Sequence, residues 1–84
     1  MDWESYAWLK RGNRRREALR IIASSNTPLT VKEIKNKLKV AMAQSSFTVK
    51  ELLDRKLVDC LNPNDKIGRL YRINKNGSEL LNGI

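Results

Sequence analysis

The apolar residues of this chain change their spacing near residue 56, and this change restricts the folds that the chain can adopt. Between residues 13 and 55 they recur every three or four positions, which is typical of amphipathic helices. After residue 56 they alternate within two short segments, LVDCLN and RLYRIN, which are joined by PNDKIG. Alternation indicates half-buried strands, and Pro, Asn, Asp and Gly are typical of a loop. The sequence therefore predicts helices followed by a two-stranded hairpin, a mainly α member of the α+β class.

The N-terminal region predicts two helices separated by a glycine. In MDWESYAWLKRG, one side of a short helix carries Trp3, Tyr6 and Ala7, and Gly12 ends the helix. These aromatic residues either cover the core or contact a second copy of the chain. Asn13 is a suitable N-cap for the next helix, RRREALRIIASS, whose apolar face consists of Ala18, Leu19, Ile22 and Ala23. In the alternative interpretation, the glycine only kinks one long helix.

Two further helices are expected in the middle of the chain, with a tight turn between them. Thr30 and Glu33 form the capping box T-x-x-E at the start of the first. The turn KVAMA supplies Val40 and Met42 as expected core residues. The helix that follows this turn runs from about residue 44 to residue 55. The apolar face of the first of these helices is formed by Val31, Ile34 and Leu38.

The charge of the chain indicates a polyanionic partner. Seventeen Lys and Arg residues face nine Asp and Glu residues, which gives a net charge of +8 over 84 residues. The cations are clustered, with six between residues 10 and 20 and four between residues 32 and 39. Clustering favours binding to nucleic acid over a merely solubilising surface, although an anionic membrane surface attracts the same pattern.

The three arginines at the start of the helix RRREALRIIASS do not stabilise that helix. Arg14, Arg15 and Arg16 occupy its first turn, where the helix dipole disfavours positive charge by about 0.3–1 kcal/mol each at low salt. A nearby phosphate would account for them. If Gly12 only kinks one long helix, the arginines lie in mid-helix and need no such explanation.

Several kinds of protein are excluded by residues that the sequence lacks. It contains no histidine and a single cysteine, Cys60, so histidine-based acid–base catalysis is excluded and neither a zinc site nor an internal disulfide is expected. No glycine-rich phosphate loop is found, and we expect no enzyme, cofactor or metal site. No apolar run is long enough to cross a bilayer, and no secretory signal begins the chain, so a cytoplasmic location is expected.

Helix, helix, tight turn, helix and hairpin is the element order of a winged helix-turn-helix. The stretch LTVKEIKNKL…SSFTVKELLDRKLVDCLNPNDKIGRLYRINKNGSELL resembles the small archaeal transcriptional regulators related to MarR and ArsR. These carry a capped second helix, the pattern S-x-x-x-x-E-L-x-x-x-G-L-V, and a wing ending R-x-Y-x-(L/I)-(T/N)-x-x-G. The resemblance covers residues 13 to 81. It implies a winged helix-turn-helix domain over residues 13–84, with a three-helix core, a two-stranded wing and short terminal helices, preceded by a helical extension over residues 1–12.

The chain departs from this pattern at Lys56, which stands where these regulators have glycine. That glycine ends a helix with a positive φ, so Lys56 either adopts the same strained conformation or changes the turn. Asn74 replaces the more usual Thr and is a good cap for a last helix, KNGSELLNGI.

The resemblance also implies a function, sequence-specific binding of double-stranded DNA with the third helix in the major groove. Phe47 lies off the apolar stripe of that helix. It therefore either touches a thymine methyl or folds back on the preceding helix, the one that carries Val31, Ile34 and Leu38. The base-reading residues expected are Gln44, Ser46, Phe47 and Lys50. The expected phosphate contacts are Arg14, Arg15, Arg16, Lys32 and Lys35, and the wing supplies Lys66 and Arg69.

Two rival functions and one further partner are open at this point. A winged helix serves equally as a protein-interaction module in a transcription or RNA-processing assembly, because fold alone does not settle function. RNA binding shares the same electrostatics as DNA binding. A homodimer is expected through the N-terminal aromatic residues and the C-terminal helix SELLNGI.

Overall fold

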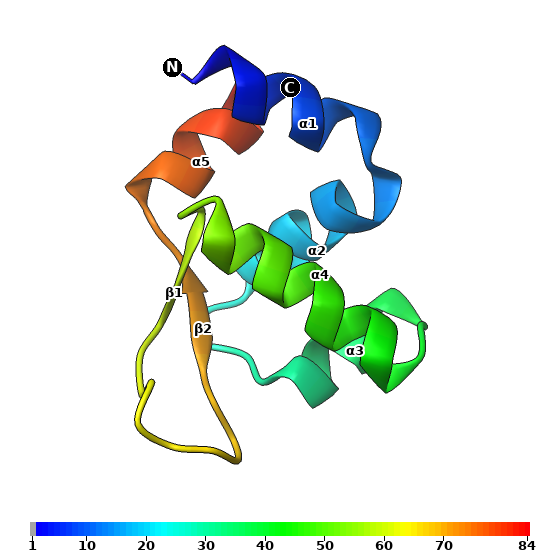
Figure 1. The fold of residues 1–84 in the computed structure, drawn as a ribbon, viewed down its shortest axis with the longest axis vertical. Coiled ribbons are helices and arrows are strands. Elements are labelled where there is room, and N and C mark those ends of the chain that lie inside the picture. The colour runs from blue at the N-terminus through cyan, green and yellow to red at the C-terminus, as the bar shows by residue number, and fades with distance from the viewer. Residues whose placement is uncertain (1) are drawn as a thin grey trace.

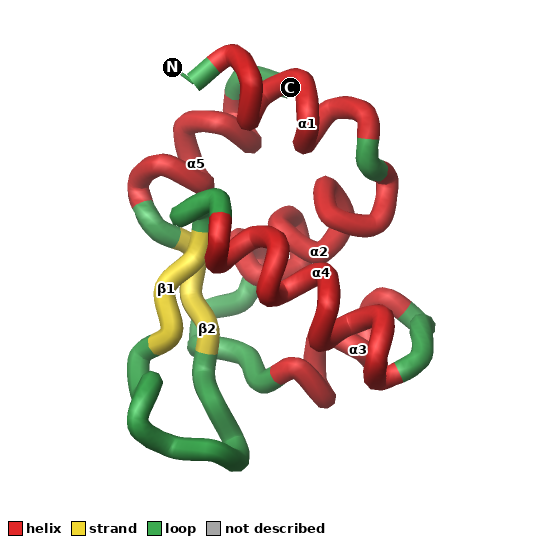
Figure 2. Tube along the Cα trace, viewed as in Figure 1, coloured by secondary structure: helices red, strands yellow, loops and turns green. Residues whose placement is uncertain are grey.

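The computed structural model describes residues 2–84, and their secondary structure is mainly helical. Figure 1 shows three helices beside a hairpin, with the first and last helices of the chain together at one end and the loop of the hairpin projecting from the other. Figure 2 shows that this loop is longer than either strand. The predicted winged helix-turn-helix is confirmed. In chain order the elements are α1 (Trp3–Arg11), α2 (Asn13–Ser24), α3 (Val31–Leu38), α4 (Met42–Asp54), β1 (Val58–Cys60), β2 (Tyr71–Ile73) and α5 (Lys75–Asn82).

The core lies where α2, α3 and α4 meet. Leu19, Ile34 and Leu52, one from each helix, are completely buried. The N-terminal helix adds Leu9, also completely buried, so α1 packs into the same core as the domain that follows it. The hairpin and α5 close the core with Leu57, Val58, Tyr71 and Leu80.

The side of α1 that faces the core differs from the predicted one. Its buried residues are Ser5 and Leu9, one helical turn apart, whereas Trp3 is 71% exposed. Tyr6 and Trp8 pack against the core from its edges. Of the two interpretations of the aromatic residues, coverage of the core is wrong for Trp3, because Leu9, not an aromatic residue, lies on the buried side of this short helix.

The helix caps follow the sequence in two of three predicted cases. Glu33 N donates to Thr30 Oγ1 at 3.2 Å and Thr30 N donates to Glu33 Oε1 at 2.9 Å, which completes the capping box of α3. Gly77 N donates to Asn74 Oδ1 at 2.9 Å, so Asn74 caps α5 as expected. The predicted cap Asn13 was wrong, because the helix begins one residue earlier and its N-cap is Gly12, which has no side chain to offer.

The junction between α1 and α2 explains two of the three consecutive arginines. Gly12 has extended backbone (φ −106°, ψ 105°), so the two helices are separate and not one kinked helix. Arg15 Nε donates to the carbonyl oxygen of Trp8 at 2.7 Å, and Arg16 donates to that of Lys10. These carbonyls belong to the last turn of α1, the negative end of its dipole. Arg15 and Arg16 are therefore accounted for by partners within the protein, and a phosphate role for the three arginines stays a prediction.

Two lysines take the left-handed conformation that usually belongs to glycine. Lys56 has φ 61°, so it reproduces the glycine turn that precedes the wing. Of the two predicted outcomes, a strained Lys56 or a changed turn, the first is confirmed. Lys39 also has φ 61° and turns the chain between α3 and α4. This turn is shorter than predicted, because α4 already begins at Met42. The side chain of Met42 is 44% exposed. The prediction that Met42 fills the core was wrong, since Ser45 and Val49 define the buried face.

The wing strands pair in antiparallel fashion, with Asp59 opposite Arg72 at the centre. They are shorter than the alternating segments of the sequence, three residues each. A bridge that was not predicted from the sequence extends the sheet on its other side. Leu29 N donates to Tyr71 O at 3.0 Å and Tyr71 N donates to Leu29 O at 2.8 Å. This single residue before α3 ties the helix-turn-helix to the wing.

Candidate nucleic-acid interface

Helix α4 is fixed on its neighbours by one face, and this decides which residues it exposes. Val49 and Leu52 are buried, and Ser45, also buried, donates from Oγ to the carbonyl oxygen of Val31 at 2.9 Å. That bond joins the two helices of the helix-turn-helix. The opposite face of α4 is exposed and carries Ala43, Ser46, Phe47, Lys50 and Asp54.

Phe47 projects from this face and does not fold back on α3. Its side chain is 62% exposed. It borders a shallow hollow of about 320 Å³ that also takes in Arg14, at the start of α2. Exposure of a phenylalanine on a helix that has a well-formed buried face has no explanation in the packing of this chain. The alternative in which Phe47 packs on α3 is therefore wrong.

The other predicted base-reading residues are all exposed, but they differ in whether they already make hydrogen bonds within the protein. Ser46 and Lys50 are exposed. Gln44 is exposed too, but its Oε1 accepts a hydrogen bond from Ala41 N at 3.3 Å, which caps the start of α4. The amide nitrogen of Gln44 remains a donor, so this side chain has both a structural task and an available polar group.

A groove gathers three separate segments of the chain. It has a volume of about 500 Å³ and lies between the start of α3, the start of α4 and the wing. Among the predicted residues it brings together Ser46 and three cations, Lys32, Lys66 and Arg69. The sequence did not single out the apolar part of the lining, which consists of Val31, Met42, Ile67 and Tyr71.

The expected phosphate-binding residues fall into two groups. Arg14 and Lys32 are exposed, and Lys35 is half-buried with Nζ 3.5 Å from Asn36 Oδ1. Arg15 and Arg16 already have partners within the protein. In addition to its bond to the α1 carbonyl, Arg15 lies with Nη1 4.0 Å from Glu51 Oε2 of α4. A phosphate role stays a prediction for each of these residues, and the structure favours Arg14 and Lys32 as the freest.

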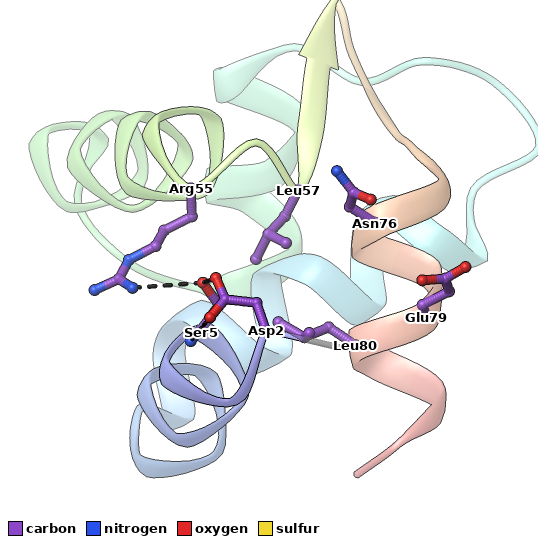
Figure 3. A pocket seen from close by; sticks show the side chains of 7 residues that line it. All are labelled: Asp2, Ser5, Arg55, Leu57, Asn76, Glu79 and Leu80. Carbon is purple, nitrogen blue, oxygen red and sulfur yellow. Dashed lines mark hydrogen bonds between the residues drawn. The ribbon is translucent and has the colours of Figure 1, made fainter.

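A second hollow lies away from the groove, between α1, the end of α4 and α5 (Figure 3). Its volume is about 240 Å³. Arg55 reaches into it and donates to Ser5 Oγ at 3.5 Å, while its Nη1 lies 3.8 Å from Glu4 Oε1. Ser5 Oγ in turn donates to Asp2 at 2.6 Å, and this bond lowers the pKa of the Asp2 carboxyl. The sequence did not indicate Arg55, whose charge is matched by neighbouring carboxylates.

Among residues 2–84, no helix has the length and apolar character that crossing a membrane requires.

The chain was compared with known proteins by sequence and by structure. No protein-family model matches it, and no curated protein matches its sequence. Solved structures do match. The multiple antibiotic-resistance repressor MarR from Listeria monocytogenes has a TM-score of 0.75 at 18% identity, over 94% of this chain and 52% of its own. The PcaV transcriptional regulator from Streptomyces coelicolor has a TM-score of 0.75 at 15% identity, over 96% of this chain and 65% of its own.

A third structure matches at a similar size. The DNA-binding TubR fragment from Clostridium botulinum has a TM-score of 0.61 at 20% identity, over 86% of this chain and 95% of its own. These likenesses establish a MarR-like winged-helix fold. The present chain spans about half to two thirds of the length of the two full regulators. The archaeal source that the sequence resemblance implies stays a prediction.

Proposed function

We propose that this protein binds double-stranded DNA sequence-specifically as a small transcriptional regulator. In this proposal α4 enters the major groove, and the wing contacts the adjacent backbone or minor groove. The observation that carries it is the groove between α3, α4 and the wing, where Lys32, Lys66 and Arg69 surround the exposed start of α4. Cations from two segments, the start of α3 and the wing, converge there on α4, whose outer face is exposed.

The outer face of α4 supplies the groups that base recognition requires. Ser46 and the amide nitrogen of Gln44 are hydrogen-bonding groups at the N-terminal part of the helix, the part that reaches base edges in helix-turn-helix proteins. Lys50, one turn further on, reaches guanine or a phosphate. Phe47 offers an apolar surface to a thymine methyl, the one apolar group in the major groove. Its 62% exposure in the free protein agrees with this role.

Phosphate contacts on either side of α4 would set the register of the protein on DNA without reading sequence. Lys32 projects from the start of α3 into the groove, and Arg14 lies at the start of α2 beside Phe47. Each of these two exposed cations therefore borders a hollow that the proposed recognition surface also lines, Lys32 with Ser46 and Arg14 with Phe47. The names of the three structural neighbours, a repressor, a transcriptional regulator and a DNA-binding fragment, support the same function.

Pairing of two copies is proposed for the opposite end of the molecule. Tyr6 Oη donates to the carbonyl oxygen of Gly83 at 3.0 Å, which holds α1 against the end of α5. Trp3 stands beside it, 5.7 Å from the Tyr6 ring centre in an edge-on arrangement, and is 71% exposed. Ile84 is exposed as well. Trp3, Tyr6 and Ile84 thus offer an apolar surface to a second copy, so that two α4 helices would address two half-sites.

A competition experiment tests the proposed function against its rivals. A labelled duplex selected from a random pool is bound by the protein and then challenged with unlabelled duplex DNA of the same site, scrambled duplex DNA, or duplex RNA. We expect the selected DNA to displace the probe at the lowest concentration and RNA at the highest. Equal displacement by RNA would favour RNA binding. Failure to bind any duplex at low salt would contradict the proposal and favour a protein-interaction module.

A further inference from the structure

The tip of the wing carries an apolar residue that the fold does not use. Ile67 is 91% exposed, more than any other large hydrophobic residue of the described chain. It stands between Lys66 and Gly68, in the loop between β1 and β2 that projects from the hairpin in Figure 1. Exposure of a whole isoleucine side chain forgoes the stabilisation that burial of its methyl groups would give. A site for that side chain outside the protein would account for its position.

The loop that holds this residue is built by its own hydrogen bonds. Asn62 Nδ2 donates to Asp65 Oδ2 at 2.9 Å and to the carbonyl oxygen of Gly68 at 3.2 Å, and Asn62 Oδ1 accepts from Leu70 N at 2.7 Å. One side chain therefore ties three points of the loop together. The result is an ordered tip, which costs less conformational entropy on binding than a floppy one.

One further hydrogen bond and a backbone turn fix the direction of the tip. Arg69 Nε donates to the carbonyl oxygen of Asp65 at 2.6 Å, across the base of the tip. Gly68 has φ 72°, a conformation that favours glycine and turns the chain back immediately after Ile67. The isoleucine is therefore presented outward by the residues on both sides of it.

The charge around the tip indicates its partner. Lys66 and Arg69 flank Ile67, and Lys32 lies across the groove that all of them line. An apolar side chain beside three cations suits a polyanion with an apolar interior. DNA fits this description, because its phosphate backbone encloses stacked base pairs. A protein partner would leave these cations poorly matched, because charged residues are depleted at the core of protein interfaces.

We infer that Ile67 is a wedge that enters the minor groove and partly unstacks one base step while the flanking cations hold the phosphates on either side. This inference rests on the proposed DNA binding and names the residue that deforms the duplex. Pyrimidine–purine steps such as TA and CA unstack most easily, so the wedge would make the protein prefer such a step at a fixed distance from the major-groove site. Part of the specificity would then arise without any hydrogen bond to a base.

The test uses the selected duplex with 2-aminopurine, whose fluorescence increases on unstacking, placed at successive steps beside the major-groove site. With the unaltered protein we expect one step to brighten. Ile67→Ala should abolish this signal and weaken binding by at least about tenfold, since the methyl groups of the side chain lose their burial. The salt dependence of binding should not change, because no charge is removed.

Two matched variants separate the wedge from other effects. Leu61→Ala removes another exposed apolar side chain of the wing, 44% exposed and away from the tip, and should leave both signal and affinity unchanged. Lys66→Ala should reduce the salt slope by about one unit and retain the fluorescence signal. Replacing the bright step by AA should weaken the unaltered protein and have little effect on Ile67→Ala. Circular dichroism of each variant checks that the fold is intact.

The outcomes distinguish this inference from the proposed function. If the unaltered protein binds the duplex and no step brightens, or if Ile67→Ala binds and brightens the step as before, the wedge is wrong and DNA binding stands. In that case the exposed isoleucine belongs to a contact with another protein. If the unaltered protein binds no duplex at all, both the proposed function and the wedge are wrong.

Discussion

The guanidinium of Arg15 lies with its Cζ 4.3 Å from the centre of the Trp8 ring, and its Nε donates to the Trp8 carbonyl oxygen at 2.7 Å. One side chain of α2 thus holds both the ring and the backbone of α1. Arg55, at the end of α4, lies 4.7 Å from the centre of the same ring. The N-terminal helix is therefore attached to the winged helix by two cations that meet at one tryptophan.

Arg15→Ala is expected to destabilise the protein by about 1–2 kcal/mol, the sum of a lost hydrogen bond and a lost cation–π contact. Urea unfolding followed by circular dichroism measures this loss. The matched control is Arg14→Ala, one residue earlier and exposed, which should leave the free energy of unfolding unchanged. Equal stability of the two variants would show that Arg15 does not hold α1 in place.

The same pair of variants is expected to separate stability from DNA binding. Arg14→Ala should reduce the slope of log K against log salt by about one unit, because one phosphate contact is lost. Its effect should be alike on selected and scrambled duplexes, since phosphates carry no sequence information. Titration of a labelled duplex at several salt concentrations measures the slope. An unchanged slope would exclude Arg14 from the interface.

Phe47→Ala is expected to leave stability within about 0.5 kcal/mol of the unaltered protein, because the side chain is already exposed. On DNA it should weaken binding by roughly 1 kcal/mol at sites that carry the contacted thymine, the contribution of a partly buried ring. Replacing that thymine by uracil, which lacks the methyl group, should weaken the unaltered protein and not the variant. A large loss of stability with unchanged site preference would contradict this role.

Much of the fold follows from local signals in the sequence. The capping box at Thr30 and the cap at Asn74 were predictable because each needs only residues three positions apart. The bridge between Leu29 and Tyr71 was not, because it joins single residues far apart in the chain and Leu29 lies in no alternating run that indicates pairing. The orientation of α1 was missed for a related reason, since a nine-residue helix with apolar residues on several sides has no single preferred face.

Less of the candidate site was predictable. The place of Phe47 off the apolar stripe of α4 was predictable, but it left both exposure and packing on α3 open, and only the structure shows that the side chain is exposed. The partners of Arg15 and Arg16 were not predictable, because they are carbonyl oxygens of α1, and backbone groups leave no mark in a sequence. Ile67 was overlooked because an isolated apolar residue in a loop is ordinary, and only the projecting loop and the hydrogen bonds of Asn62 make it distinctive.

Lys56→Gly is expected to stabilise the protein. Lys56 has φ 61°, a strained conformation that glycine adopts freely. Glycine loses more chain entropy on folding, but relief of the strain is larger, and the net gain in stability should be about 0.5–1 kcal/mol. Lys37→Gly, within α3, is the control and should cost about 1 kcal/mol. Urea unfolding of both variants measures the differences. A destabilised Lys56→Gly would mean that the lysine side chain contributes more than its backbone strain costs.

The capping box of α3 predicts a dependence of stability on pH. The hydrogen bond from the Thr30 backbone holds the pKa of the Glu33 carboxyl below its usual value of 4.5. Its ionised form therefore adds stability that is complete above that value and is lost as the pH falls through the lower pKa of the folded state. Glu33→Gln should lower Tm at pH 6, and the difference should close in acid. A difference that is constant from pH 6 to pH 3 would contradict this account.

The central claim, that the groove and the outer face of α4 form a DNA-binding surface, is tested most directly by the salt dependence of binding to the selected duplex. If about five phosphates are neutralised, log K should fall against log salt with a slope near −4.5. The selected duplex should remain tighter than a scrambled one at every salt concentration, because the base contacts of α4 do not depend on counterion release. A steep slope with a persistent preference is the predicted result. A flat slope, or the same affinity for both duplexes throughout, would contradict the account.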